Sequence, residues 1–167
     1  TLAAGHLDLY GGDAFLLAPR RSPLREALPW TETATTLTDC EELAARLASN
    51  LDGHAAGAGT PPLVVVDDGD ELADGLAAMH LERLVRRSRD GAATVAVAAQ
   101  THVLHRAFGG WLMEARKAKH GLLLAPETDV DGDLFAVRLP RKSTRRFPPG
   151  RGYLVVRGEI RFVQVAR

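Results

Sequence analysis

The sequence has a single cysteine, Cys40, among its 167 residues. One cysteine excludes an internal disulfide and a metal site built from several thiolates, so we expect a reducing compartment. The chain also lacks a signal peptide and any apolar run approaching the roughly 18 residues that a membrane-spanning helix needs. We therefore expect a soluble, cytoplasmic segment. Because it opens on Thr1 without a methionine, we expect it to be cut from a longer protein.

Aromatic residues are also scarce, at 5% of the chain, and give no stacking platform to argue from. Lys plus Arg and Asp plus Glu number 21 each, so the net charge is zero and gives no bulk attraction to nucleic acid. Positive charge is clustered, although such clusters usually form solvated faces. The two clusters consist of Arg83, Arg86, Arg87 and Arg89, and of Arg138, Arg141, Lys142, Arg145 and Arg146.

The residues that are present suit one globular domain. Hydrophobic residues make up 46% of the chain, and a domain of this length buries about 70% of the surface that its unfolded chain exposes. Short apolar runs alternate with helical patterns, which predicts an α/β fold with a mostly parallel sheet and helices on both faces. A β-hairpin around Arg157-Gly158-Glu159 is expected at the edge of that sheet. The expected strands before it are Ala14–Leu17, Leu63–Val66, a buried strand over Thr94–Ala99, and Gly121–Leu124.

Helices are expected between these strands. A capping box at Thr38–Glu41 opens a helix whose Leu43, Leu47 and Leu51 share one face. Residues 20–30 and 53–62 are rich in proline or glycine and should be loops. Residues 1–7 look like the end of a further helix. A helix is predicted at 70–89, with an apolar side that begins with Leu72, Leu76 and Met79 and drifts to Leu81, Leu84 and Val85. Another is predicted at 103–119, where Phe108, Trp111 and Leu112 pack and Gly109-Gly110 breaks the helix.

Two carboxylates, Asp67 and Asp68, directly follow the apolar run Leu63–Val66. Ligands of open α/β sheets gather at the carboxyl ends of the strands, where acids can hold a phosphate-bound cation. A solvated Asp-Asp-Gly turn would have the same sequence. Gln100, just beyond the strand at Thr94–Ala99, is open to the same two interpretations: a phosphate or water contact, or a polar strand end.

Two other polar patterns favour simpler interpretations. Asp129, Asp131 and Asp133 offer oxygens for calcium, but the spacing is not that of an EF-hand, so a polar turn is favoured. His102 and His105 lie one helical turn apart and His120 follows, without an acidic or cysteine partner nearby in sequence that would favour zinc. The Gly-x-Ser-x-Gly pattern of serine hydrolases is missing.

Several segments in their order and spacing resemble the FtsK/SpoIIIE family of ATPases, and most closely the C-terminal ATPase modules of EccC-type motors in the type VII secretion systems of actinobacteria. Each motif is weak alone, but the resemblance runs over residues 1–166. The segments are Ala18-Pro19-Arg20-Arg21-Ser22-Pro23-Leu24, Val64-Val65-Val66-Asp67-Asp68, Gly121–Leu124, Asp131–Phe135, Pro148–Val155 and Val163–Ala166.

The resemblance implies a single P-loop NTPase domain of the RecA/FtsK type over residues 1–167, with ATP and Mg²⁺ as its cofactors. Asp67 matches the Walker B aspartate that orients Mg²⁺ through water. Asp68 stands where the family usually has the catalytic glutamate, and Gln100 matches the polar residue after the neighbouring strand. Arg89 matches an arginine that the family commonly carries before that strand, and the resemblance implies a role in nucleotide binding. The helix dipole alone adequately explains an arginine at a helix end.

Two departures from the family matter. The phosphate-binding loop, Gly-x-x-x-x-Gly-Lys-Ser/Thr, is absent, and Thr1-Leu2-Ala3-Ala4 resembles the helix that follows such a loop, so we expect the domain to lack its N-terminal P-loop portion. Asp68 is one methylene shorter than glutamate, which weakens water activation. Both departures predict a degenerate module.

The resemblance implies a module of a motor that exports small helical proteins of the WXG type. Its partners would be other ATPase modules, in tandem or in a hexamer, within a membrane-anchored parent protein that this segment does not itself attach to the membrane. Two alternatives stay open. One is a module that recognises the signal helix of a substrate without hydrolysing ATP; the other is a DNA translocase like FtsK, although no DNA-reading winged-helix tail is recognisable.

Overall fold

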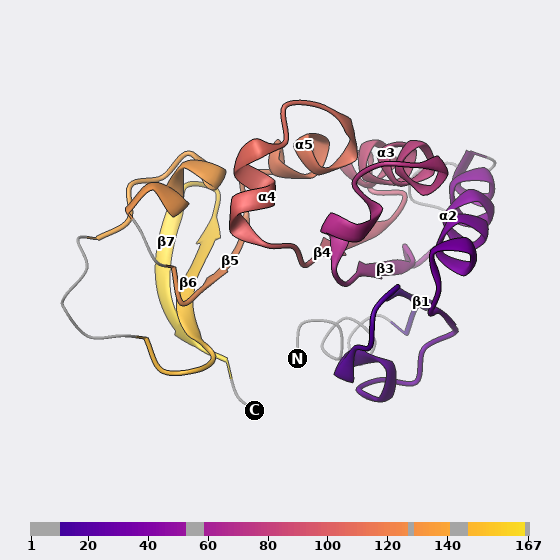
Figure 1. The fold of residues 1–167 in the computed structure, drawn as a ribbon, viewed down its shortest axis with the longest axis horizontal. Coiled ribbons are helices and arrows are strands. Elements are labelled where there is room, and N and C mark those ends of the chain that lie inside the picture. The colour runs from indigo at the N-terminus through magenta and orange to yellow at the C-terminus, as the bar shows by residue number, and fades with distance from the viewer. Residues whose placement is uncertain (1–10, 53–58, 127–128, 141–146, 166–167) are drawn as a thin grey trace. The chain divides into compact units, whose positions relative to one another are not determined.

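The computed structural model describes residues 11–52, 59–126, 129–140 and 147–165. The chain divides into two compact units, an N-terminal unit that ends at Ala115 and a C-terminal unit that begins at Arg116 (Figure 1). The predicted α/β fold, with a parallel sheet and a hairpin near the C-terminus, is confirmed. The helix predicted at residues 1–7 and part of the loop predicted at 53–62 lie outside the described residues.

A four-stranded parallel sheet with the order β2-β1-β3-β4 forms the base of the N-terminal unit. All residues of β3 are buried, because their side chains pack into a core cluster on each face of the sheet. Strand β2 was not predicted from the sequence, because Glu32-Thr33-Ala34 contains no apolar run. The strands are β1 (Ala14–Leu17), β2 (Glu32–Ala34), β3 (Leu63–Val66) and β4 (Thr94–Val97).

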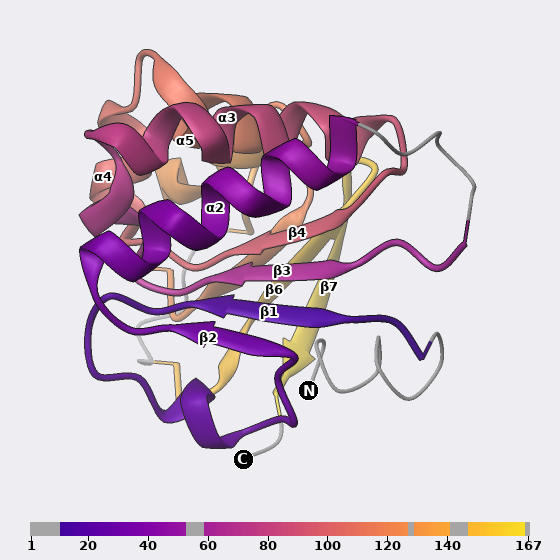
Figure 2. The ribbon, with the colours of Figure 1, turned by 90° about the vertical axis from the view of Figure 1, so that its right-hand side faces the viewer.

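The two faces of this sheet have different covers. Val64 and Val66 point into the larger core, to which all four described α-helices contribute (Figure 2). Leu63 and Val65 point the other way, where Trp30 and the loop with the 3₁₀ helix η1 (Pro23–Glu26) pack against them. In the described residues, helical cover is therefore found on one face. The α-helices are α2 (Leu37–Asp52), α3 (Leu76–Arg89), α4 (Thr101–Arg106) and α5 (Gly110–Arg116).

The capping box of α2 lies two residues before the predicted one. The Asp39 backbone N–H donates to Thr36 Oγ1, and the Thr36 N–H donates to Asp39 Oδ2, both at 3.1 Å. The prediction of Thr38 and Glu41 is wrong because the helix already begins at Leu37, which makes Thr36 the flanking residue. The hydrogen bond from Thr36 lowers the pKa of Asp39. The predicted apolar face of Leu43, Leu47 and Leu51 is confirmed as buried.

The predicted helix 70–89 is divided. Residues Gly69–Leu72 form the 3₁₀ helix η2, and α3 begins only after Gly75, whose φ of 87° breaks the helical course. Leu72 is buried as predicted, but Leu76 and Met79 are each 61% exposed, so their placement in the core is wrong. Leu81, Leu84 and Val85 are buried as predicted, with Ala77 beside them.

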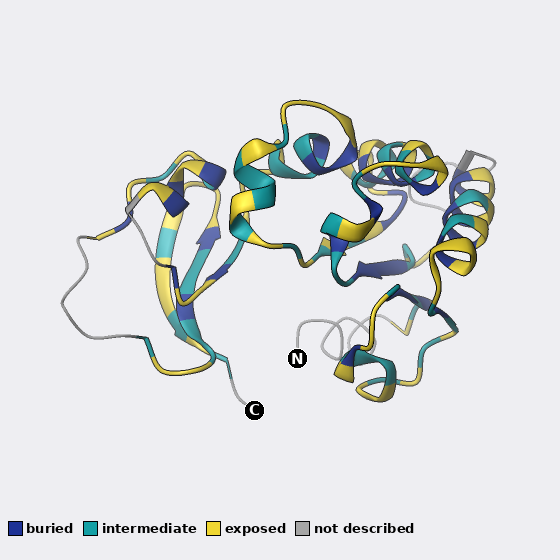
Figure 3. Cartoon of the chain, viewed as in Figure 1, coloured by how far each residue is buried: buried dark blue, intermediate teal, exposed yellow. Residues whose placement is uncertain are grey.

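Two further burial predictions are wrong. Strand β4 was expected to be buried, yet Thr94 and Ala96 are exposed and only Val95 and Val97 pack against the core. In the described part of the chain, β4 is the last strand of its sheet, and its second face is left uncovered there (Figure 3). Phe108 is 90% exposed, whereas its predicted companions Trp111 and Leu112 are buried. Phe108 lies in the break between α4 and α5, where no helical register directs it inward.

The C-terminal unit contains a three-stranded antiparallel sheet with the order β5-β6-β7. The predicted hairpin is confirmed, and its turn residues Arg157 and Gly158 have φ values of 51° and 81°, as a two-residue type I′ turn requires. The hairpin pairs with β5 and not with the parallel sheet, so the predicted parallel setting of Gly121–Leu124 is wrong. The elements are β5 (Gly121–Leu124), the 3₁₀ helix η3 (Asp129–Phe135), β6 (Arg151–Val156) and β7 (Glu159–Gln164).

The division into units also divides the charge. Residues 1–115 carry 16 Asp or Glu and nine Lys or Arg, whereas residues 116–167 carry five and 12. The neutral chain is therefore an acidic N-terminal part joined to a basic C-terminal part. Among the described residues, no helix is long and apolar enough to cross a membrane.

Candidate functional site

The acid pair lies at the carboxyl end of β3, where the parallel strand direction brings together the ends of its neighbours. The Asp67 N–H donates to the carbonyl of Leu17, the last residue of β1, at 2.9 Å. The Gly69 N–H donates to the carbonyl of Ala98, just after β4, at 2.8 Å. Both aspartates, which are half-buried, are thus held between the ends of the two strands that flank β3.

Asp68 turns the chain sharply. Its φ and ψ are 51° and 48°, in the left-handed region, and its carbonyl accepts the Glu71 N–H at 2.9 Å to start η2. Non-glycine residues seldom adopt this conformation, and aspartate is one of the few that tolerate it. The turn therefore fixes the direction in which the Asp68 side chain leaves the strand.

Burial raises the pKa of Asp68, and the carboxylates of Asp67 and Asp70 raise it further, while Arg20 acts in the opposite direction. One carboxylate oxygen of Asp70, Oδ1, is buried and has no hydrogen-bond partner among the described residues. The carboxylates at this edge of the sheet therefore carry more negative charge than Arg20 compensates, and such an excess favours the binding of a cation.

Replacing Asp68 with asparagine is expected to stabilise the chain at neutral pH, since asparagine tolerates the left-handed turn and carries no charge. A raised pKa in the folded state means that the stabilising contribution of Asp68 is fully present below its unfolded pKa, near the ordinary 3.8, and is lost as the pH rises through the folded value. The advantage of Asp68→Asn should thus shrink as the pH falls toward about 4. Urea unfolding at several pH values measures it, and a pH-independent difference would contradict the assignment.

Gln100 lies at the same edge, three residues beyond the end of β4, at the start of α4. Its carbonyl accepts the N–H groups of Val103 at 3.0 Å and Leu104 at 3.1 Å, whereas its side chain makes no capping bond. The side chain is exposed, so it is available to a ligand at this edge. The structure thus brings Asp67, Asp68 and Gln100 to the ends of two adjacent strands.

Arg20, to which the sequence analysis gave no role, lies beyond the carboxyl end of β1 and forms an ion pair with Glu71 of η2. Both partners are partly exposed, so the pair contributes little to stability. Its sequence signal was a basic residue just after a predicted strand, in a loop segment that carries part of the family resemblance but was given no role of its own.

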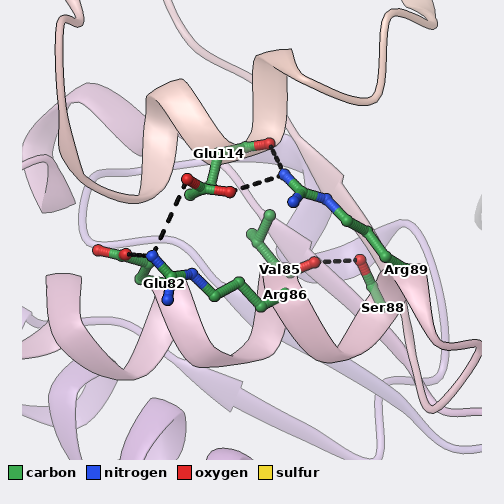
Figure 4. Close-up of polar contacts among 6 residues, drawn as sticks. All are labelled: Glu82, Val85, Arg86, Ser88, Arg89 and Glu114. Atoms are coloured by element: carbon green, nitrogen blue, oxygen red, sulfur yellow. Dashed lines mark hydrogen bonds and ion pairs between the residues drawn. The ribbon is translucent and has the colours of Figure 1, made fainter.

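Arg89 is not part of this group. It ends α3, which runs back from the carboxyl edge of the sheet to the amino edge between β3 and β4. There its guanidinium donates to the Glu114 carbonyl at 2.8 Å and to Glu114 Oε2 at 2.7 Å (Figure 4). The Glu114 side chain is only 7% exposed, and Arg86 lies 3.9 Å from its other oxygen. A nucleotide contact by Arg89 stays a prediction, since its observed partner is Glu114.

The carboxylate oxygens of the acid pair fit one part of a site for a magnesium nucleotide. In the described part of the chain, no group of three or more His, Cys, Asp or Glu side chains could hold a metal ion directly. A single carboxylate that acts through water, with phosphate oxygens as the other ligands, needs no such group. The 167 residues contain no Gly-x-x-x-x-Gly-Lys-Ser/Thr loop, so the residues present fit the metal and water side of the site and not the phosphate cradle.

The amino-acid sequence matches no protein-family model and no curated protein. The fold, however, is similar to solved structures of ATPases. The cytoplasmic domain of the Thermomonospora curvata type VII secretion ATPase EccC aligns with 93% of this chain at a TM-score of 0.71 and 19% identity. ATPases 2 and 3 of the same EccC, in complex with a signal sequence peptide, align with 93% at 0.70 and 20% identity.

ATPases 2 and 3 of EssC from Geobacillus thermodenitrificans align with 92% of the chain at a TM-score of 0.61 and 16% identity. The chain covers 20% of the first EccC structure and 31% of each of the other two, so it spans between a fifth and a third of their lengths. The class of fold is therefore the one that solved ATPase domains share. More particularly, it is the fold of an ATPase module of the EccC and EssC type.

Proposed function

We propose that the chain is an ATPase module of a type VII secretion motor, on the cytoplasmic side of a membrane-anchored parent protein. The observation that carries the proposal is the meeting of Asp67, Asp68 and Gln100 at the ends of β3 and β4, in a fold whose solved neighbours are secretion ATPases. In this proposal Asp67 orients Mg²⁺ through water, and Asp68 and Gln100 contact the water that attacks the γ-phosphate.

Asp67 would hold Mg²⁺ through water, and the ion would supply positive charge against the negative charge that develops during phosphoryl transfer. The task of the chain is then to position groups around that ion. Asp68 has a raised pKa because of its burial and its acidic neighbours, which favours proton acceptance. Its shorter side chain and fixed left-handed turn limit its reach, so we propose a slow or degenerate module whose phosphate contacts come from residues outside this sequence.

Recognition of a secretion signal is a second candidate role. One structural neighbour, EccC from T. curvata, was solved with a signal sequence peptide bound to its ATPases 2 and 3. The N-terminal unit of this chain leaves the large apolar side chains of Leu76, Met79 and Phe108 exposed, and an amphipathic signal helix is the kind of partner that such side chains bind. Substrate binding without ATP turnover would favour this role.

DNA translocation is the remaining alternative. The excess of Lys and Arg in residues 116–167 is the observation that favours it, because the net charge of zero conceals a basic C-terminal part. Phosphate contacts make DNA binding weaken steeply with salt. Binding with that salt dependence, unaffected by a signal peptide, would favour translocation over secretion.

A thermal melt with Mg²⁺-ATP tests the proposed function. At a ligand concentration 100 times the dissociation constant, the folded state gains about 2.7 kcal/mol, and Asp67→Ala is expected to remove most of this gain. Asp74→Ala is the matched control, since Asp74 is an exposed aspartate of the same unit. The melt is run on this chain and on any longer form that its gene encodes upstream of Thr1. If no form responds, or if Asp67→Ala responds like the wild type, the proposed function fails.

A further inference from the structure

Trp111, in the first turn of α5, is fully buried and lies against the loop that carries the acid pair. Its indole Nε1–H donates to the carbonyl of Leu72 at 2.7 Å. Leu72 ends η2, and η2 begins directly after Asp68. The indole therefore holds the far end of the turn that Asp68 starts.

The same ring also closes on the near end of that turn. A Cβ atom at Gly69 would lie 3.0 Å from Trp111 Cη2, 3.0 Å from Val97 Cγ1 and 3.3 Å from the Ala98 carbonyl oxygen. The backbone after Asp68 thus fits between the indole and the end of β4. Since η2 is only four residues long, contacts at Gly69 and Leu72 leave it little freedom to move.

Helix α5 is itself fixed to α3. Glu114, three residues after Trp111, receives two hydrogen bonds from Arg89, and Arg86 approaches its second carboxylate oxygen (Figure 4). Trp111 and Glu114 are thus one turn apart on α5, one in contact with the loop after β3 and the other with the end of α3. A continuous set of contacts joins Arg89, which lies at the amino edge, to Asp68, which lies at the carboxyl edge.

We propose that Trp111 is a positioning residue that holds Asp67 and Asp68 in place by clamping Gly69 and Leu72, and that the Arg89–Glu114 pair sets the position of this clamp. The proposal rests on the proposed function insofar as it concerns catalysis. It assigns Arg89 an indirect action on the acid pair through α5, in place of a direct contact with a nucleotide.

The polar contact of the indole is what separates positioning from packing. Phenylalanine at position 111 would fill most of the same space but would leave the buried Leu72 carbonyl without its donor. Leu112, the next residue of α5, is also buried in the core, and no hydrogen bond of its side chain holds η2. Trp111→Phe and Leu112→Ala therefore form a matched pair, since both disturb the packing of α5 and only the first removes the clamp.

Native-state hydrogen exchange is the readout, because it reports local opening apart from global unfolding. In Trp111→Phe, exchange at the Gly69 and Glu71 amides, which donate to Ala98 and Asp68, is expected to accelerate at least about tenfold more than exchange in the β1–β3 ladder. In Leu112→Ala, exchange at these two amides and exchange in the β1–β3 ladder should accelerate by the same factor. Equal acceleration in Trp111→Phe, or the same local opening in Leu112→Ala, would overturn the proposal.

A second readout uses Trp111 as its own probe. Trp30 is the only other tryptophan, so Trp30→Phe leaves Trp111 as the one tryptophan, in contact with the loop that follows the acid pair. Addition of Mg²⁺ alone is expected to change its emission, and the additional change Asp67→Ala should abolish that response. If the Gly69–Leu72 turn opens locally in Trp111→Phe but Mg²⁺ does not change the emission, the positioning role of Trp111 stands and the metal role proposed for Asp67 fails. Failure of this inference and failure of the proposed function are therefore distinguishable.

Discussion

Replacing Arg89 with alanine is expected to lower the free energy of unfolding of the N-terminal unit by about 2 kcal/mol. The change removes the ion pair between Arg89 and the Glu114 carboxylate, whose side chain is 7% exposed. Breaking a fully buried pair in this way typically costs about 3–5 kcal/mol. The lower figure applies here because Arg89 is 43% exposed and Arg86 remains 3.9 Å from Glu114.

Both tryptophans lie in the N-terminal unit, so urea unfolding followed by their fluorescence reports that unit. Glu114→Gln in the same chain should restore part of the loss, since it removes the buried negative charge that Arg89 compensates in the wild type. Arg106→Ala is the control, because Arg106 is an exposed arginine of the same unit; its effect should stay within about 0.5 kcal/mol. A stability loss that arises only in the presence of nucleotide would instead favour a nucleotide contact for Arg89.

Replacing Gly152 with alanine is expected to destabilise the C-terminal sheet by about 3 kcal/mol or more. A Cβ atom at this position would lie 2.0 Å from the Leu123 carbonyl oxygen and 2.9 Å from its carbonyl carbon. Both atoms belong to the backbone of β5, so relief requires the strands to separate and not a side chain to rotate. The glycine permits the close approach of β5 and β6.

Amide signals of the strand pair β5 and β6 measure this effect, while the tryptophan fluorescence of the other unit serves as an internal reference. Gly158→Asn is the matched control. Its Cβ would meet nothing within 4 Å, and asparagine tolerates the φ of 81°. If Gly152→Ala were as mild as this control, the close approach of the two strands would be contradicted.

Elements with a strong local signal were predicted correctly. The apolar residues of Leu63–Val66 require burial on both faces, and a central position in a parallel sheet provides it. The positions of Asp67, Asp68 and Gln100 then follow, because consecutive parallel strands end at one edge. Their chemistry does not follow from position alone, and their roles as metal and water ligands stay predictions.

The errors share a physical cause, which is that local patterns do not specify neighbours. Gly121–Leu124 is as apolar as a parallel core strand, and only its pairing with β6 shows otherwise. Leu76 and Met79 fit a helical stripe that begins at residue 70, but the break at Gly75 changes which side chains face inward. The contact between Trp111 and the loop at Gly69 joins segments about 40 residues apart, and no local spacing could reveal it.

The tight turn at Arg157-Gly158 also bears on how the molecule acquires its structure. In the hairpin, Val156 pairs with Glu159, three residues away, whereas Leu16 of the parallel sheet pairs with Val65, 49 residues along the chain. Contacts of low sequence separation form first, since little chain entropy is lost in closing them, and hairpins form in roughly 1–10 μs. When this chain refolds, β6 and β7 should therefore pair before β1 and β3 do, although they come later in the sequence.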